Sequence, residues 1–144
     1  MPLTFNASLF HNEVKAWMEE VDVQTVRAIR EPIKAVNREL IAQWPVKTGL
    51  SRGSWFAGIG AVPTGQGSIG APVLTRLNGI ADKLKPGDVY YVSNTAPYAA
   101  RIEFGFTGAD VLGRQYDTRG RFILQGIMSR ITQIIETANA RFLR

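Results

Sequence analysis

The sequence predicts an α+β fold in which a small antiparallel β-sheet is flanked by a long N-terminal helix and a C-terminal helix. Three observations lead to this fold class: helical periodicity through 1–44, strand-like runs within 45–105, and a second helical stripe in 121–144. At 144 residues the chain fits a single domain, 1–144, with a hydrophobic core of its own.

The N-terminal segment predicts one long helical element, which at 1.5 Å per residue would extend about 55 Å if unbroken. Pro32 interrupts the pattern, so we expect a kink or a break near Arg30 and Glu31, or two helices that meet there. We expect part of the element to project and to pack on another subunit; the alternative is a helical hairpin folded back on its own sheet. The apolar stripe comprises Phe10, Val14, Trp17, Met18, Val21, Val26, Ile29, Ile33, Val36, Leu40, Ile41 and Trp44.

A hinge at 45–55 joins this helix to the β-rich middle of the chain. Pro45 cannot continue a helix without the loss of a backbone hydrogen bond, so the helix is expected to end at Trp44. The pair Thr48-Gly49 supplies a residue able to adopt positive φ, and 54–59 then has the composition of a strand.

A glycine- and proline-rich stretch over 61–72 follows the first strand and predicts irregular structure. It contains the pattern G-x-G-x-x-G at Gly65, Gly67 and Gly70. A dinucleotide site needs a strand directly before the first glycine and a helix at the last one, and Pro63 and Pro72 interrupt both. We therefore interpret the pattern as a chance match or a flexible loop.

The remaining elements follow from composition and spacing. We expect a short helix over 73–84, a strand over 89–94, and a turn that leads into one or two helical turns closed by Gly105. Several glycines and arginines with few large aliphatic residues over 106–120 predict a surface loop that could order against a partner. The closing helix, 121–144, is expected to cover the sheet with Ile123, Ile127, Ile131, Ile134, Ala138 and Phe142.

Composition limits the possible functions. The net charge is +5, with the positive excess in 45–87 and 121–144, which suits an acidic protein neighbour or DNA. There is no cysteine, and His11 alone cannot supply a metal site, so we predict no cofactor and no metal. No apolar run is long enough for a membrane span. Arg101 and Glu103 point to different sides of a helical turn, which makes them candidates for pairing between subunits and not an acid–base pair. We therefore expect a non-enzymatic structural or binding protein.

Two sequence blocks in order carry a family resemblance. The first is PVKTGLSRGSW over 45–55, and the second is VSNTAPYAARIEFG over 92–105. Together they resemble the tail-completion, or neck, family of long-tailed bacteriophages, the HK-type phage tail-component family. Lys47 and the long insertion over 61–87 depart from the family pattern. The residues that carry the resemblance, and that we take as signature or interface candidates, are Thr48, Gly49, Arg52, Ser54, Trp55, Asn94, Pro97, Tyr98, Arg101, Glu103 and Gly105.

The resemblance implies a virion structural protein located in the neck or tail, and in the host cytoplasm during assembly. It implies a homo-oligomeric ring of six copies at the head–tail junction that couples the tail to the connector. The implied partners are an adjacent connector or stopper protein, a tail-terminator or tail-tube protein, and, transiently, the genomic DNA in the lumen. The signature residues would either fix the fold of one subunit or contact a partner ring. The alternative function, from the charge excess, is a small basic DNA-binding protein.

Overall fold

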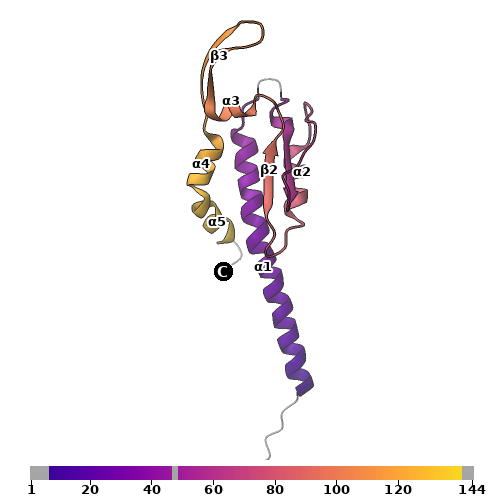
Figure 1. Cartoon of the computed structure of the whole chain (residues 1–144). Helices are drawn as coiled ribbons and strands as arrows, with labels where there is room; N and C mark the ends of the chain where they lie inside the picture. The colour runs from indigo at the N-terminus through magenta and orange to yellow at the C-terminus, as the bar shows by residue number, and fades with distance from the viewer. Residues whose placement is uncertain (1–6, 47–48, 141–144) are drawn as a thin grey trace, which may run out of the picture.

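The computed structural model describes residues 7–46 and 49–140, with side chains from Asn12 onward, and these residues form an α+β fold (Figure 1). Thr48 and 141–144 of the expected closing helix lie outside the described residues. In chain order the elements are α1 (Ala7–Gln43), a short 3₁₀ turn η1 (Arg52–Ser54), β1 (Trp55–Ile59), α2 (Val73–Ala81), β2 (Tyr90–Asn94), α3 (Ala99–Phe104), β3 (Gly105–Ala109), β4 (Gln115–Arg119), α4 (Ile123–Ser129) and α5 (Ile131–Asn139).

The helix α1 runs through Pro32 as one element of 37 residues, so the expected break and the alternative of two helices are wrong, whereas a kink near Arg30 and Glu31 stays a prediction. A proline inside a helix costs about 3 kcal/mol through a lost hydrogen bond and a steric clash. Pro32 is buried beside apolar side chains of α1 and α5, among them Ile131 and Ile135. Burial of this apolar surface offsets the cost and keeps the helix continuous. The alternative of a helical hairpin is excluded by the same continuity.

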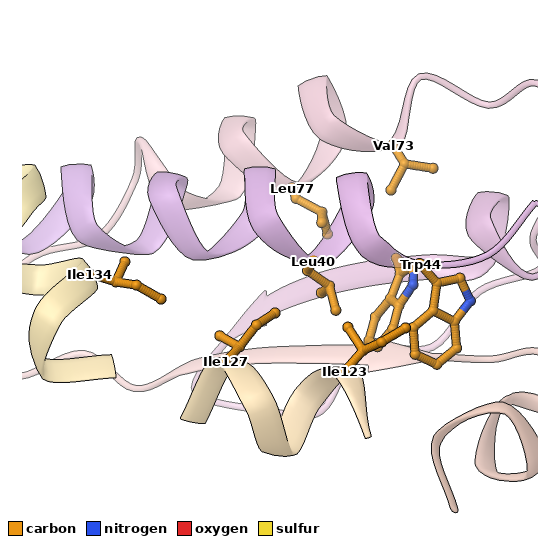
Figure 2. Packing of buried hydrophobic residues seen from close by; sticks show 8 residues of the cluster. Leu40, Trp44, Val73, Leu77, Ile123, Ile127 and Ile134 are labelled. Carbon is orange, nitrogen blue, oxygen red and sulfur yellow. The ribbon is translucent and has the colours of Figure 1, made fainter. Parts of the chain in front are cut away.

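The C-terminal half of α1 is the central layer of the molecule. The antiparallel pair β1–β2 and the helix α2 lie on one side of it, and α4 and α5 lie on the other (Figure 1). Figure 2 shows the core between these layers, where Leu40 of α1 and Trp44, the residue directly after α1, lie between side chains of α2 and α4. The rings of Trp44 and Trp55 meet edge to face with centroids 4.9 Å apart. The core cluster comprises Leu40, Trp44, Trp55, Val73, Leu77, Ile123, Ile127 and Ile134.

Several predicted elements are confirmed in the structure. The first strand, the short helix, the second strand and the helical turns before Gly105 all form within the expected segments. Gly105 ends α3 with φ of 84°, and a Cβ there would lie 2.6 Å from the backbone nitrogen of Gly120. The stretch 61–72 is irregular, as expected.

Three expectations about the C-terminal part of the chain are wrong. The segment 106–120 is not a loop, because β3 and β4 pair as an antiparallel hairpin with Gly105 opposite Arg119. The chain therefore has two two-stranded sheets within its described residues, where one sheet was expected. The closing helix is divided at Arg130 into α4 and α5, and both pack mainly on α1 and not on the sheet.

The hairpin escaped prediction because its contacts are exposed pairs across the strands. The rings of Phe106 and Tyr116 lie 6.2 Å apart, and Thr107 bonds Asp117 at 3.2 Å. At the tip, Asp110 accepts hydrogen bonds from the backbone of Leu112 and Arg114. A strand that faces no core lacks the large aliphatic residues by which strands are recognised.

Candidate interaction site

The fold brings the two sequence blocks together. The side-chain amide of Asn94 donates to the backbone oxygen of Ser51 at 2.8 Å, and its oxygen accepts from the backbone nitrogen of Ala96 at 2.9 Å. The backbone nitrogen of Thr95 donates to the oxygen of Ser54 at 3.0 Å. The hydrogen bonds of Asn94 therefore link the turn after β2 to the hinge, and the two blocks form one continuous region.

Three hinge residues act within the subunit. Arg52 donates to the backbone oxygen of Trp44 at 2.9 Å and so satisfies a carbonyl at the end of α1. The hydroxyl of Ser54 donates to the oxygen of Leu50 at 2.6 Å, and Trp55 is buried against Trp44. The indole nitrogen of Trp44 in turn donates to the hydroxyl of Ser51 at 2.8 Å. These contacts fix the angle at which the chain leaves α1.

The glycine-rich stretch rests on this hinge. A Cβ at Gly67 would lie 2.0 Å from the hydroxyl of Ser54, so only glycine allows the two segments to approach so closely. No strand directly precedes Gly65, and α2 begins only at Val73. Gly67 therefore has a packing role against the hinge, and the glycine pattern lacks the strand–turn–helix context of a dinucleotide site.

Glu103 holds the start of α4. Its carboxylate accepts hydrogen bonds from the backbone nitrogens of Ile123, Leu124 and Gln125 at 2.9 to 3.1 Å. The residue is only 3% exposed. Because an anion at a helix N-terminus satisfies unpaired N–H groups and complements the helix dipole, Glu103 is a structural cap. The expectation that Glu103 pairs with another subunit is therefore wrong.

Three of the other signature residues, Gly49, Tyr98 and Arg101, line a cavity of about 420 Å³. It lies between the hinge, α3 and the β3–β4 hairpin, and we call it the arginine cavity. Gly49, Tyr98 and Arg101 line it, together with the hairpin residues Phe106 and Tyr116. Pro97 is exposed in the turn that leads to Tyr98. Gly49, Tyr98 and Arg101 thus face this cavity, whereas Arg52, Ser54, Trp55, Asn94 and Glu103 make contacts that hold the fold of the subunit.

The arginine cavity is positively charged. Arg101, Arg119 and Arg121 line it and are exposed, and none of the three has a carboxylate within ion-pair distance among the described residues. The guanidinium of Arg101 lies 3.8 Å from the centre of the Phe106 ring. Aromatic walls beside unpaired guanidinium groups suit a ligand that has both apolar surface and negative charge.

A second exposed surface lies at the opposite end of the molecule (Figure 1). Residues 12–23 of α1, which we call the arm, project beyond the core, and every one of them is exposed. Val14, Trp17, Met18 and Val21 recur at three- and four-residue steps, which places them on one face of the helix. Trp17 is 64% exposed. The arm carries Glu13, Glu19, Glu20 and Asp22 against a single cation, Lys15, so it is acidic.

Two structural residues were missed by the sequence analysis. Arg76 of α2 donates to the backbone oxygen of Gly53 at 3.0 Å, its guanidinium lies 3.9 Å from the Phe56 ring centre, and burial lowers its pKa. Asn37, fully buried in α1, donates to Asn78 and accepts from the hydroxyl of Tyr90, both at 3.1 Å. Burial raises the pKa of Tyr90, and the bond to Asn37 lowers it by less. Their long-range partners leave no local sequence pattern.

The described residues contain no cluster of three or more histidine, cysteine, aspartate or glutamate side chains placed to hold a metal ion. No described helix is both long enough and apolar enough to cross a membrane. The arginine cavity presents guanidinium groups and aromatic rings at one end of the molecule, and the arm presents carboxylates and an apolar stripe at the other.

Comparisons with known proteins add no family assignment. No protein-family model matches the chain, and neither the curated proteins nor the solved structures gave a match.

Proposed function

We propose that this chain is a structural subunit of a ring at the head–tail junction of a long-tailed bacteriophage, where it couples the tail to the capsid connector. One observation carries the proposal: the arm of α1 presents a bare apolar stripe that no described part of the chain covers. A soluble monomer rarely exposes a contiguous apolar face, and such a face marks a contact with another molecule.

The resemblance of the two sequence blocks to the neck family supports the same role. In this fold the blocks meet around the arginine cavity, at the end of the molecule opposite to the arm. A subunit of a closed ring needs two different complementary surfaces, because each contact in such a ring is heterologous. The arm and the arginine cavity are two such surfaces.

The proposed assembly has six copies, and its neighbours are a connector or stopper ring on one side and a tail-terminator or tail-tube ring on the other. Each subunit would be stabilised in part by these contacts, because binding to the folded state adds to stability by mass action. The genome would pass through the lumen of the ring. The proposal includes no catalytic step.

The test is the molar mass of the purified chain by light scattering, with negative-stain imaging, alone and after mixing with phage tails or DNA-filled heads. We expect ring-shaped particles, or binding to one end of the tails or heads. A chain that stays a monomer of 15.9 kDa at all concentrations and binds neither tails nor heads would refute the proposal.

A second candidate function is the binding of duplex DNA, favoured by the unpaired guanidinium groups of Arg101, Arg119 and Arg121. Phosphate contacts by such groups give affinity that falls steeply as salt is added. Titration of labelled duplex at several salt concentrations tests it. Tight binding with a steep salt dependence, from a chain that stays monomeric, would favour this function; no binding at low salt would exclude it.

A further inference from the structure

We propose that the arm of one copy of this chain docks in the arginine cavity of the next copy. Trp17 supplies the apolar anchor, and the carboxylates beside it pair with the guanidinium groups of the cavity. This inference rests on the proposed function, because it names the surfaces that join neighbouring subunits of the ring. The occupant of the cavity is thus a second copy of the same chain.

The charges of the two surfaces are complementary. The cavity has three guanidinium groups that meet no carboxylate within the part of the chain that the structure describes, and the arm has four carboxylates with one lysine. Glu13 and Glu20 are seven residues apart, which is two helical turns, so they lie on the same flank of the apolar stripe as Trp17. An exposed carboxylate on that flank is well placed to meet an arginine when the stripe is buried. Opposite charges across an interface also fix the register of the partners.

The apolar surfaces match as well. The cavity, of about 420 Å³, falls within the size range of sites that enclose a small organic ligand, so it can accept an indole ring. Its walls include Tyr98, Phe106 and Tyr116, and tryptophan and tyrosine are the residues that most often carry the binding energy of an interface. Trp17 is the largest exposed side chain of the arm.

The placement of the two surfaces determines the type of assembly. They lie at opposite ends of the subunit, so one copy can use its arm and its cavity at the same time with two different neighbours (Figure 1). Repetition of such a head-to-tail contact gives a ring when the rotation closes and an open filament when it does not. A phosphate backbone would also suit the arginines, but it would leave the bare apolar face of Trp17 without a partner.

Chemical cross-linking tests the docking directly, because the chain has no cysteine. Val21→Cys on the apolar face of the arm and Thr118→Cys at the cavity are introduced into separate full-length chains, which are then mixed. A bismaleimide is used because it joins thiols over a wider range of separations than a disulfide allows. The control is Val23→Cys with Thr118→Cys, since residue 23 lies on the opposite face of the arm.

We expect the mixture of Val21→Cys with Thr118→Cys to form a covalent dimer. The control mixture of Val23→Cys with Thr118→Cys should form little or none. Equal yields in both mixtures, or no dimer in either, would overturn the docking proposal. In the same assay Glu20→Arg and Arg101→Glu should each reduce the dimer, and the two changes together should restore it. Lys83→Glu makes the same change in charge as Arg101→Glu, but at an exposed position on α2's side of the molecule. It should leave the yield of dimer unchanged.

The outcomes separate the two proposals. Ring particles or particle-end binding without the specific cross-link would overturn the docking and leave the neck function standing. The specific cross-link in a chain that never binds tails or heads would support the docking and count against the neck function. If Arg101→Glu leaves the dimer intact but weakens salt-sensitive binding to duplex DNA, the arginines of the cavity bind nucleic acid. The docking proposal then fails.

Discussion

The two halves of α1 have the same helical periodicity and opposite surroundings. At the C-terminal end, Leu40 and Trp44, the residue directly after the helix, are enclosed by α2, β1 and α4. In the N-terminal half, Val14, Trp17 and Met18 continue the pattern with nothing described over them. An amphipathic pattern therefore specifies a helix with one apolar face, while the partner of that face can lie in the same chain or in another molecule.

The consequences for stability differ in the same way. The arm gains little from intrinsic helix propensity, because most helical stability in proteins comes from packing of the apolar face, and every residue of 12–23 is exposed. The core half should therefore govern unfolding of the subunit, and the arm half should respond to assembly.

The largest contrast is between Leu40→Ala and Trp17→Ala. Leu40 has no exposed surface, so its truncation should lower the free energy of unfolding by about 3 kcal/mol through lost burial and a cavity. Trp17 is 64% exposed, so Trp17→Ala should leave the stability of the isolated subunit within about 0.5 kcal/mol of wild type. Urea unfolding by circular dichroism measures both. Equal losses would mean that the arm packs within its own subunit.

Glu103→Ala should cost about 2 to 3 kcal/mol, because three backbone N–H groups at the start of α4 lose a charged acceptor. Glu103→Gln, which keeps one acceptor oxygen, is the matched control and should cost less. The loss should appear in urea unfolding of the subunit alone. Unchanged stability of the isolated subunit, with loss of assembly only, would instead restore Glu103 as a contact between subunits.

Tyr90 should make the free energy of unfolding of the subunit decrease at alkaline pH. Burial raises its pKa above the ordinary value of 10.0, so the unfolded chain releases this proton at lower pH than the folded chain does. The resulting stability is fully present below about pH 10 and is lost as the pH rises through the folded-state pKa. Thermal unfolding between pH 8 and pH 11 should show a decline. In Tyr90→Phe that decline should be smaller; an identical decline would exclude Tyr90 as its source.

The smallest effect should come from Asp110→Asn at the tip of the hairpin. Burial raises the pKa of Asp110, but hydrogen bonds from Arg114, Leu112 and Tyr116 lower it by more, so the folded-state pKa falls below 3.8. Stability from this carboxylate is present above pH 3.8 and is lost as the pH falls through the folded-state pKa. Because the tip is exposed, the variant should speed amide exchange in β3 and β4 without a change in global unfolding. A global loss would show that the hairpin supports the core.

Much of the fold followed from local pattern. The 3.6-residue stripe located α1, β-branched and aromatic runs located β1 and β2, and Gly105 marked the end of α3. The hairpin escaped because its side chains pair across exposed strands, and the division of the closing helix at Arg130 escaped because the stripe continues through it.

The site was predictable only in part. The sequence blocks indicated which residues would gather, and Asn94 does join the hinge to the turn. It could not be predicted that Glu103 would cap α4, since its partners lie some twenty residues further on and are backbone groups without a sequence signature. The same holds for Arg76, whose acceptors are the backbone oxygens of Gly53 and Trp55. Which arginines would be left unpaired depended on the tertiary contacts.

The division of α1 is tested most directly by hydrogen–deuterium exchange of the full chain, first as a dilute subunit and then in the assembled state. We expect amides of 12–23 to exchange rapidly in the dilute subunit and to become protected on assembly, while amides around Leu40 are protected in both states. Protection of 12–23 in the dilute subunit, or rapid exchange there after assembly, would contradict the claim that this half of the helix is stabilised by another copy.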